Sequence, residues 1–125
     1  MPARKAQATD AELSVLKLLW EEEPLTARDI CDRLYPAGTP SDQATVHKLL
    51  QRLEQKKFVS RDRRSFAHLF QSTVSRETLA GEQLEAIAAK LTDGSLVPFI
   101  LHAVDSRKLS TEERNEIRKL LNRRS

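Results

Sequence analysis

One stretch decides the fold of this chain: Ala44-Thr45-Val46-His47-Lys48-Leu49-Leu50-Gln51-Arg52-Leu53. Its apolar residues recur at i, i+3, i+4 and i+7, the spacing of one face of a helix: Val46, Leu49, Leu50 and Leu53. The residues between them are polar or basic. The pattern therefore predicts an amphipathic helix with one face in a core. We place this helix at residues 41–56, with Ser41 or Asp42 as its N-cap.

Two further helices are predicted before this one. Thr9-Asp10-Ala11-Glu12 fits the capping box, in which the Thr hydroxyl and the Glu carboxylate each pair with a backbone N–H group of the first turn. A second capped start lies at Thr26. Residues 1–8 are small, polar and charged, and we expect them to form a disordered arm.

After the 41–56 helix, the period changes toward alternation of apolar and polar residues. This change predicts an antiparallel hairpin over residues 58–71, in which the run from Phe66 to Phe70 belongs to the second strand. Arg63 and Arg64 then lie at or near its tip. Three helices followed by a hairpin is the order of a winged helix-turn-helix, which we assign to residues 9–73. The 41–56 helix would be its recognition helix and the hairpin its wing.

Residues 74–125 are helical in pattern throughout, with helix starts at Ser75, Ser95 and Ser110. The fold class is therefore mainly α with a small β-hairpin. The apolar stripes of these short helices are too broad for helices that stand alone. They either cover the first half of the same chain or self-associate. The first half already has a candidate core of its own: Leu13, Leu16, Trp20, Ile30, Leu34, Leu50, Leu53 and Phe58. We therefore expect a helical dimerisation region built on Leu84, Ile87, Leu91, Leu96, Phe99, Ile100, Leu101, Ile117, Leu120 and Leu121.

The charge of the chain is unevenly distributed. The whole chain has 21 basic and 18 acidic side chains, but between Gln43 and Phe70 the sequence has seven Lys or Arg and only two Asp or Glu. A local basic patch of this kind suits a polyanion such as double-stranded DNA. The candidate DNA-contacting residues lie on the recognition helix and the wing: Ser41, Gln43, Thr45, His47, Lys48, Gln51, Arg52, Arg61, Arg63 and Arg64. The alternative is that these side chains are only solvated, in a winged-helix module that docks protein and not DNA.

Several functions find no support in the sequence. One cysteine, Cys31, and three separated histidines give no metal-ligand spacing, and no phosphate loop or catalytic constellation is present. We expect no enzyme, no metal and no cofactor, and we expect Cys31 to be a small buried apolar residue. With no signal-peptide pattern and no apolar run long enough to span a bilayer, we expect a cytoplasmic protein without membrane insertion.

Several blocks of the chain together resemble the penicillinase-repressor (BlaI/MecI) family: residues 9–13, 18–20, 25–30, 44–53 and 109–113. The resemblance covers about residues 8–123. It implies a dimeric repressor with an N-terminal winged helix and C-terminal dimerisation helices, bound to palindromic operators that contain TACA and TGTA elements. In that family, a membrane sensor-protease signal can lead to cleavage between an Asn and a Phe in the dimerisation region. Here the pair at that position is His102-Ala103, which argues against induction by cleavage at this point.

Overall fold

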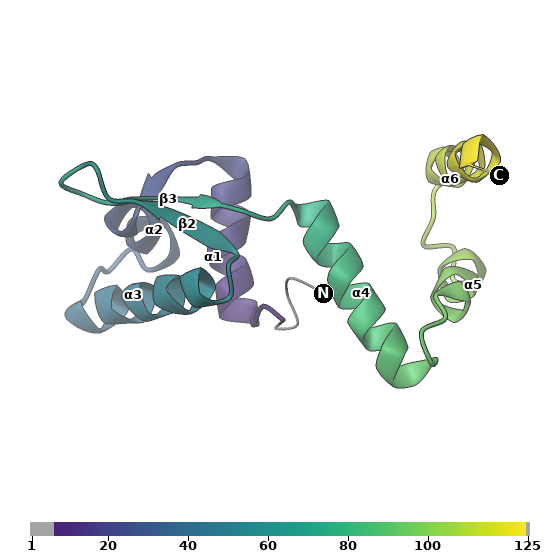
Figure 1. The fold of residues 1–125 in the computed structure, drawn as a ribbon, viewed down its shortest axis with the longest axis horizontal. Coiled ribbons are helices and arrows are strands. Elements are labelled where there is room, and N and C mark those ends of the chain that lie inside the picture. Colours follow the sequence, from purple (N-terminus) through teal and green to yellow (C-terminus); the bar gives the residue numbers. More distant parts are fainter. Residues whose placement is uncertain (1–6, 125) are drawn as a thin grey trace. The chain divides into compact units, whose positions relative to one another are not determined.

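The computed structural model describes residues 7–124 (Figure 1). Of the predicted arm at residues 1–8, only Gln7 and Ala8 belong to the described residues. The chain divides into two compact units, Met1–Ala80 and Gly81–Ser125. Each unit is described by itself below.

The described residues form six helices and a sheet of three short strands, which confirms a mainly α chain with a small β-hairpin. The elements follow in the order α1 (Asp10–Glu21), β1 (Leu25–Thr26), α2 (Ala27–Leu34), α3 (Pro40–Gln55), β2 (Val59–Asp62), β3 (Leu69–Ser72), α4 (Arg76–Leu91), α5 (Val97–Asp105) and α6 (Thr111–Arg124). The boundary between the two units falls within α4.

The starts of the first three helices depend on capping boxes. The predicted box at Thr9, which pairs with Glu12, is confirmed, and the capped start predicted at Thr26 is also a capping box, formed with Asp29. The predicted cap of α3 was wrong, because its N-cap is Thr39 and not Ser41 or Asp42. Asp42 is the third helical residue of that box, where its carboxylate accepts from the Thr39 N–H at 3.2 Å. The intervening proline occupies the first helical position, where its missing N–H leaves no bond unmade.

The sheet has the strand order β1-β3-β2, and both pairings are antiparallel. The predicted hairpin is confirmed, with Val59 opposite Ser72 and Asp62 opposite Leu69. Its second strand is shorter than expected, because residues 66–68 belong to the turn. The strand β1 was not predicted. It adds Leu25 opposite Phe70 on the far edge of β3.

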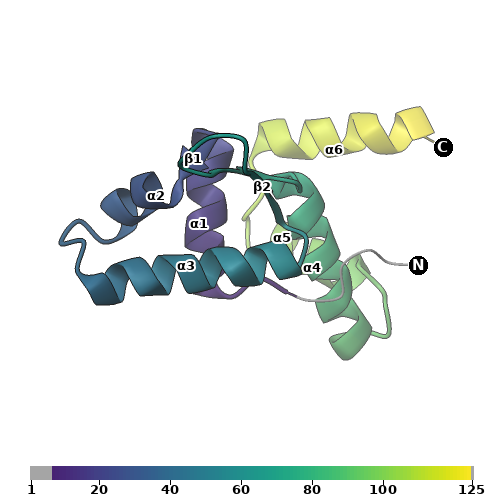
Figure 2. The same cartoon turned by 60° about the vertical axis from the view of Figure 1, so that its left-hand side comes forward.

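One core holds unit 1 together. Its buried residues come from α1, α2, α3, the three strands, the start of α4 and the segments before β2 and α4: Val15, Leu16, Leu19, Leu25, Ile30, Cys31, Val46, Leu49, Leu50, Leu53, Phe58, Val59, Phe70, Val74 and Leu79. Five of the eight predicted core residues are among them, and Leu13, Trp20 and Leu34 are partly buried and pack against them. Burial of each large apolar side chain stabilises the fold by roughly 1.5–3 kcal/mol. α3 lies beside α1 in this core (Figure 1, Figure 2).

Unit 2 exposes most of its large apolar side chains. Nine of the ten residues predicted for dimerisation are exposed, among them Leu91 at 74% and Leu121 at 67%, and Phe99 is half-buried. The helix start predicted at Ser95 was wrong. α5 begins at Val97 with Leu96 as its N-cap, and the Ser95 hydroxyl accepts from the Val97 N–H at 3.3 Å. The helix start predicted at Ser110 is confirmed, because Ser110 and Glu113 form the reciprocal hydrogen bonds of a capping box at the start of α6. Within residues 7–124, no helix is both long and apolar enough to cross a bilayer.

Candidate nucleic-acid interface

The face that α3 buries in the core determines which of its residues are exposed to solvent. Val46, Leu49, Leu50 and Leu53 are at most 4% exposed, so this side of the helix is sealed in the core. In a helix with 3.6 residues per turn, Lys48 and Gln55 then point away from the core. The buried stripe predicted from the sequence is thus confirmed, and it determines which side chains α3 presents to solvent.

All seven residues predicted on this helix as DNA contacts are exposed: Ser41, Gln43, Thr45, His47, Lys48, Gln51 and Arg52. Two of them are engaged within the chain, since the Thr45 hydroxyl donates to Ser41 O at 3.0 Å and the Gln43 amide donates to Gly38 O at 3.1 Å. Among the described residues, no hydrogen bond or ion pair holds the side chains of Lys48 or Gln51. The structure therefore places all seven side chains on one solvent-exposed surface of α3.

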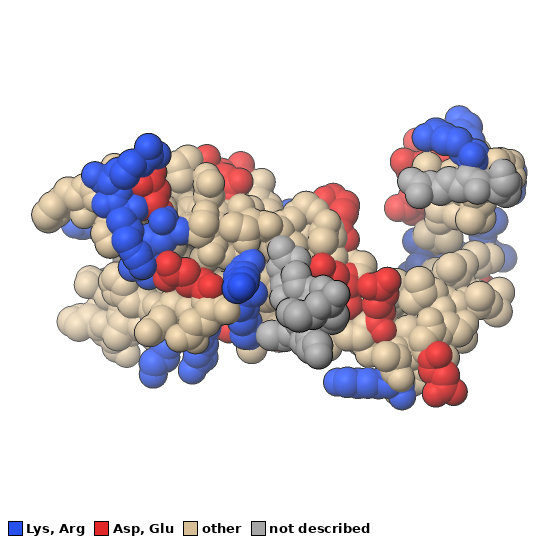
Figure 3. All heavy atoms as spheres, in the orientation of Figure 1, with Lys and Arg blue, Asp and Glu red and all other residues tan. Residues whose placement is uncertain are grey.

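The three predicted arginines of the hairpin each have a carboxylate partner. Arg61 Nη2 donates to Glu54 Oε1 at 2.9 Å, and Arg63 Nη2 lies 3.4 Å from Glu54 Oε2. Arg64 donates to both oxygens of Asp62, at 3.1 and 2.9 Å. Lys and Arg thus gather over the hairpin with acidic side chains among them (Figure 3). This surface is less cationic than its count of arginines suggests.

The exposure of the three arginines differs strongly. The side chain of Arg61 is 23% exposed, that of Arg63 is 57% exposed and that of Arg64 is 90% exposed. Asp62 caps the turn as well, because its Oδ1 accepts from the backbone N–H of Arg64 at 3.0 Å. The hydrogen bonds from the Arg64 side chain and backbone lower the pKa of Asp62 to about 2. Asp62 therefore stays ionised at neutral pH.

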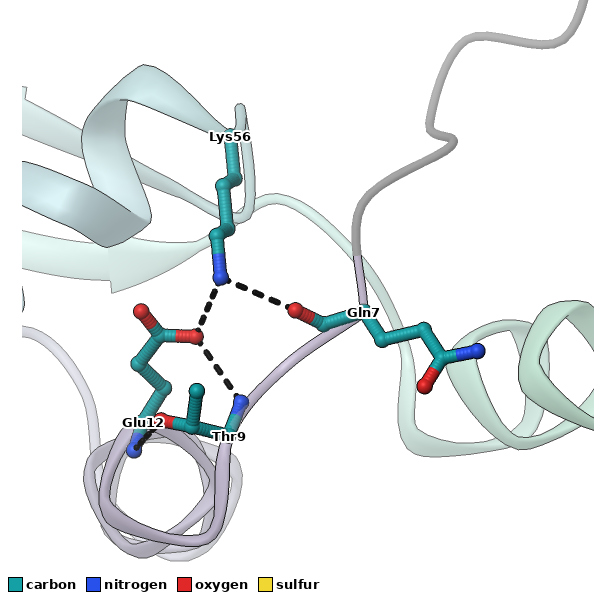
Figure 4. Close-up of polar contacts among 4 residues, drawn as sticks. All are labelled: Gln7, Thr9, Glu12 and Lys56. Carbon is teal, nitrogen blue, oxygen red and sulfur yellow. Dashed lines mark hydrogen bonds and ion pairs between the residues drawn. The ribbon is translucent and has the colours of Figure 1, made fainter.

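A partly buried ion pair at the C-terminal end of α3 was not predicted. Lys56, the C-cap of α3, donates from Nζ to Glu12 Oε1 at 2.6 Å and to Gln7 O at 2.9 Å (Figure 4). The Glu12 side chain is only 1% exposed. Burial raises its pKa, but the hydrogen bonds from Lys56 and the Thr9 N–H, with the charges of Lys56 and Arg52, outweigh burial and leave the pKa lowered. The sequence marked Glu12 only as a capping residue.

A fully exposed phenylalanine lies in the turn of the hairpin. Phe66 was predicted within the second strand, where alternation would place its side chain on one face of the sheet. In the structure it precedes β3, and it is the only large hydrophobic residue exposed in the described part of unit 1.

Cys31 is buried, as expected, and burial together with the nearby Asp42 and Asp32 raises the pKa of its thiol. A raised pKa disfavours the reactive thiolate. In the part of the chain that the structure describes, no three His, Cys, Asp or Glu side chains gather as metal ligands. The geometry thus offers a polar and basic surface on α3 and the hairpin.

Comparison with known proteins gives consistent relatives. A model of the penicillinase repressor family matches residues 8–123. The chain is 23% identical to the penicillinase repressor of Bacillus licheniformis over 115 residues, which covers 92% of this chain and 89% of the relative. It is 23% identical to the methicillin resistance regulatory protein MecI of Staphylococcus aureus over 124 residues, 99% of this chain and 100% of the relative. It is 30% identical to the transcriptional regulator BlaI of Mycobacterium tuberculosis over 121 residues, 95% of this chain and 86% of the relative.

Proposed function

Because this chain belongs to the penicillinase repressor family, a family of transcriptional repressors and not of enzymes, we propose that it represses transcription as a homodimer bound to palindromic operators. Residues 9–73 would be the DNA-binding domain and residues 74–125 the dimerisation domain. The protein would act in the cytoplasm. The observation that carries the proposal is the arrangement of α3, whose apolar stripe is buried while its polar and basic face is exposed.

We propose that side chains on the exposed face of α3 contact the DNA directly. The Arg52 guanidinium has the planar fork that pairs with a guanine edge, and the Gln51 amide can pair with adenine. Lys48 suits a base or a phosphate. Contacts to phosphate oxygens, which fix the position of the protein on the duplex, would come from Ser41, Gln43, Thr45 and His47. These groups need no rearrangement of the core to reach a groove.

On the wing, Arg63 and Arg64 are proposed to contact phosphates, because their side chains are the two most exposed arginines of the hairpin. Arg61 was predicted as a third contact. Its guanidinium is held between Glu54 and the ring of Phe70, which supports a role in placing the hairpin.

The proposed dimer rests on the apolar surface of unit 2. Leu84, Ile87, Leu96, Ile100 and Leu101 are each at least 36% exposed, which is costly for a surface that meets only water. A two-fold dimer would bury this surface and present two α3 helices to successive half-sites, roughly 34–36 Å apart. Relief of repression by cutting at position 102–103 is not part of the proposal, because His102-Ala103 replaces the Asn-Phe pair.

The test is a selection followed by a titration. The purified full chain is used to enrich duplexes from a random library, and the enriched duplex is then titrated in mobility shifts at increasing salt. The proposal predicts an inverted repeat with TACA and TGTA elements, and an affinity that falls with a log–log slope of several units. A chain that enriches no sequence, or that binds with no salt dependence, would instead be a winged-helix module that docks protein.

A further inference from the structure

The wing is tied to the recognition helix by one carboxylate. Glu54 lies in the last turn of α3, Arg61 lies in β2, and Arg63 follows that strand directly. Oε1 of Glu54 accepts from Arg61 Nη2 at 2.9 Å, and Oε2 faces Arg63 Nη2 at 3.4 Å. The Glu54 side chain is 29% exposed, so the pair with Arg61 is partly shielded from water. Such a pair holds its geometry better than an exposed one.

The two arginines are held to different degrees. The Arg61 guanidinium also lies 4.8 Å from the ring centroid of Phe70, which is a core residue, and its Nη1 is 3.5 Å from His68 Nδ1. Arg61 is thus anchored to the sheet. Arg63 has a longer contact to Glu54 and a side chain that is 57% exposed. A phosphate could therefore take over Arg63 and leave the pair of Glu54 and Arg61 in place.

This arrangement has an electrostatic consequence. In the free protein, Glu54 shares its negative charge with both guanidinium groups, so their positive charge is partly withheld from a passing phosphate. Binding to any DNA gains free energy from each phosphate that a free cation neutralises, whatever the sequence. Sequence preference depends instead on α3 and the wing being placed together on one site. A carboxylate that restrains the arginines therefore weakens binding to DNA of any sequence. It also supports sequence preference, because it holds α3 and the wing in one arrangement.

We propose that Glu54 is a positioning residue that sets sequence specificity, by fixing the wing against α3 and withholding the charges of Arg61 and Arg63 from non-operator DNA. The inference rests on the proposed function as a DNA-binding repressor. A carboxylate by itself repels phosphates. Glu54 would nevertheless help the protein to discriminate one duplex from another.

The chain offers a matched control for the removal of Glu54. Asp62→Asn also removes one carboxylate from the wing, but Asp62 pairs with Arg64, and among the described residues no hydrogen bond or ion pair joins Asp62 to α3. An asparagine keeps the side-chain oxygen that accepts from the Arg64 backbone N–H. Glu54→Gln and Asp62→Asn thus each remove one negative charge. Only Glu54→Gln removes the ion pairs that join the wing to α3.

Both variants and the unmodified chain are titrated against two probes, the duplex that the unmodified chain enriches and a shuffled duplex of the same composition. For Glu54→Gln, we expect tighter binding to the shuffled duplex, a salt slope steeper by about 1, and a ratio of the two affinities that falls on the order of tenfold. For Asp62→Asn, we expect a ratio within about twofold of the original. An unchanged ratio for Glu54→Gln, or an equal loss in Asp62→Asn, overturns the proposal.

Two further outcomes are distinguishable. If the unmodified chain enriches no duplex, the proposed function itself fails. If Glu54→Gln does not fold, Arg63→Gln replaces it, since this change leaves the pair of Glu54 and Arg61 intact. The proposal then predicts a salt slope that is shallower by about 1 on the enriched duplex, where one phosphate contact is lost, and nearly unchanged on the shuffled duplex, from which Arg63 is withheld. A slope on the enriched duplex equal to that of the unmodified chain, or an equal loss of slope on both duplexes, would overturn the proposal.

Discussion

The Nζ atom of Lys56 lies 2.6 Å from Oε1 of Glu12, which joins the C-cap of α3 to the first turn of α1. The same carboxylate oxygen accepts from the backbone N–H of Thr9, so one oxygen closes the capping box of α1 and holds the end of α3. The surface proposed to read DNA is therefore fixed at its C-terminal end by two charged groups. One of them is almost completely buried.

Replacement of Lys56 by methionine should destabilise the protein. The change keeps much of the aliphatic stem but leaves the Glu12 carboxylate buried without a cation, and we expect a loss of about 2–3 kcal/mol in the free energy of unfolding. Lys48→Met is the control, because Lys48 is exposed, and it should change stability by less than about 0.5 kcal/mol. Urea denaturation of the full-length chains measures both. Equal effects of the two changes would show that the ion pair does not stabilise the fold.

The stability of the protein should fall in acid, in part through Glu12. Its pKa is lowered in the folded state, so its contribution is complete above the ordinary value of 4.5 and is lost as the pH falls through the folded-state pKa. The carboxylate of Asp62 likewise loses its stabilising contribution in acid, as the pH falls from its ordinary pKa of 3.8 to its folded-state pKa of about 2. Urea unfolding midpoints between neutral and acidic pH should decline less steeply in Glu12→Gln than in the unmodified chain. Identical pH profiles would contradict the lowered pKa.

Arg52→Ala should weaken binding to the enriched duplex by roughly 1–3 kcal/mol and relax the base preference at one position of each half-site. The reason is that a guanidinium in the major groove pairs with two acceptors of one guanine. Lys17→Ala is the control, since Lys17 is an exposed cation on α1. Repeating the selection with each variant measures the preference. If Arg52→Ala enriches the original sequence with unchanged affinity, Arg52 is not a contact.

Leu101→Asp should dissociate the proposed dimer, because a carboxylate would be placed in an apolar interface without a partner. Leu101 is 56% exposed in the single chain, so the change should leave the folded protomer intact. His102→Asp adds the same charge at the next residue, which is exposed but was not assigned to the interface. Sedimentation equilibrium should give the mass of a monomer for the first variant and of a dimer for the second. A dimer in both would place the interface elsewhere.

The local features of this fold could be predicted because their causes are local. The stripe from Val46 to Leu53 has the helical period, and the boxes at Thr9 and Thr26 each span four residues. The cap at Thr39 was missed because Thr39-Pro40 also reads as a turn. Proline is common both in turns and at the first position of a helix.

The contacts that determine the candidate site could not be predicted in the same way. Glu12 and Lys56 are 44 residues apart, and each alone resembles an ordinary surface charge. The pair of Glu54 and Arg61 depends on the path of the chain from α3 into β2, which periodicity does not specify. The strand β1 has two residues, too few to show alternation. The sequence thus predicted the exposed face of α3, whereas the ion pairs around it needed the tertiary structure.

The central claim, that the exposed face of α3 meets DNA, is tested most directly by a site-specific photo-cross-link. A benzophenone amino acid is placed at Gln51 on α3 and, in a second chain, at Lys17 on α1, and each chain is irradiated with the enriched duplex. The account predicts a protein–DNA adduct from position 51 and none from position 17. An adduct from position 17 without one from position 51 would contradict it.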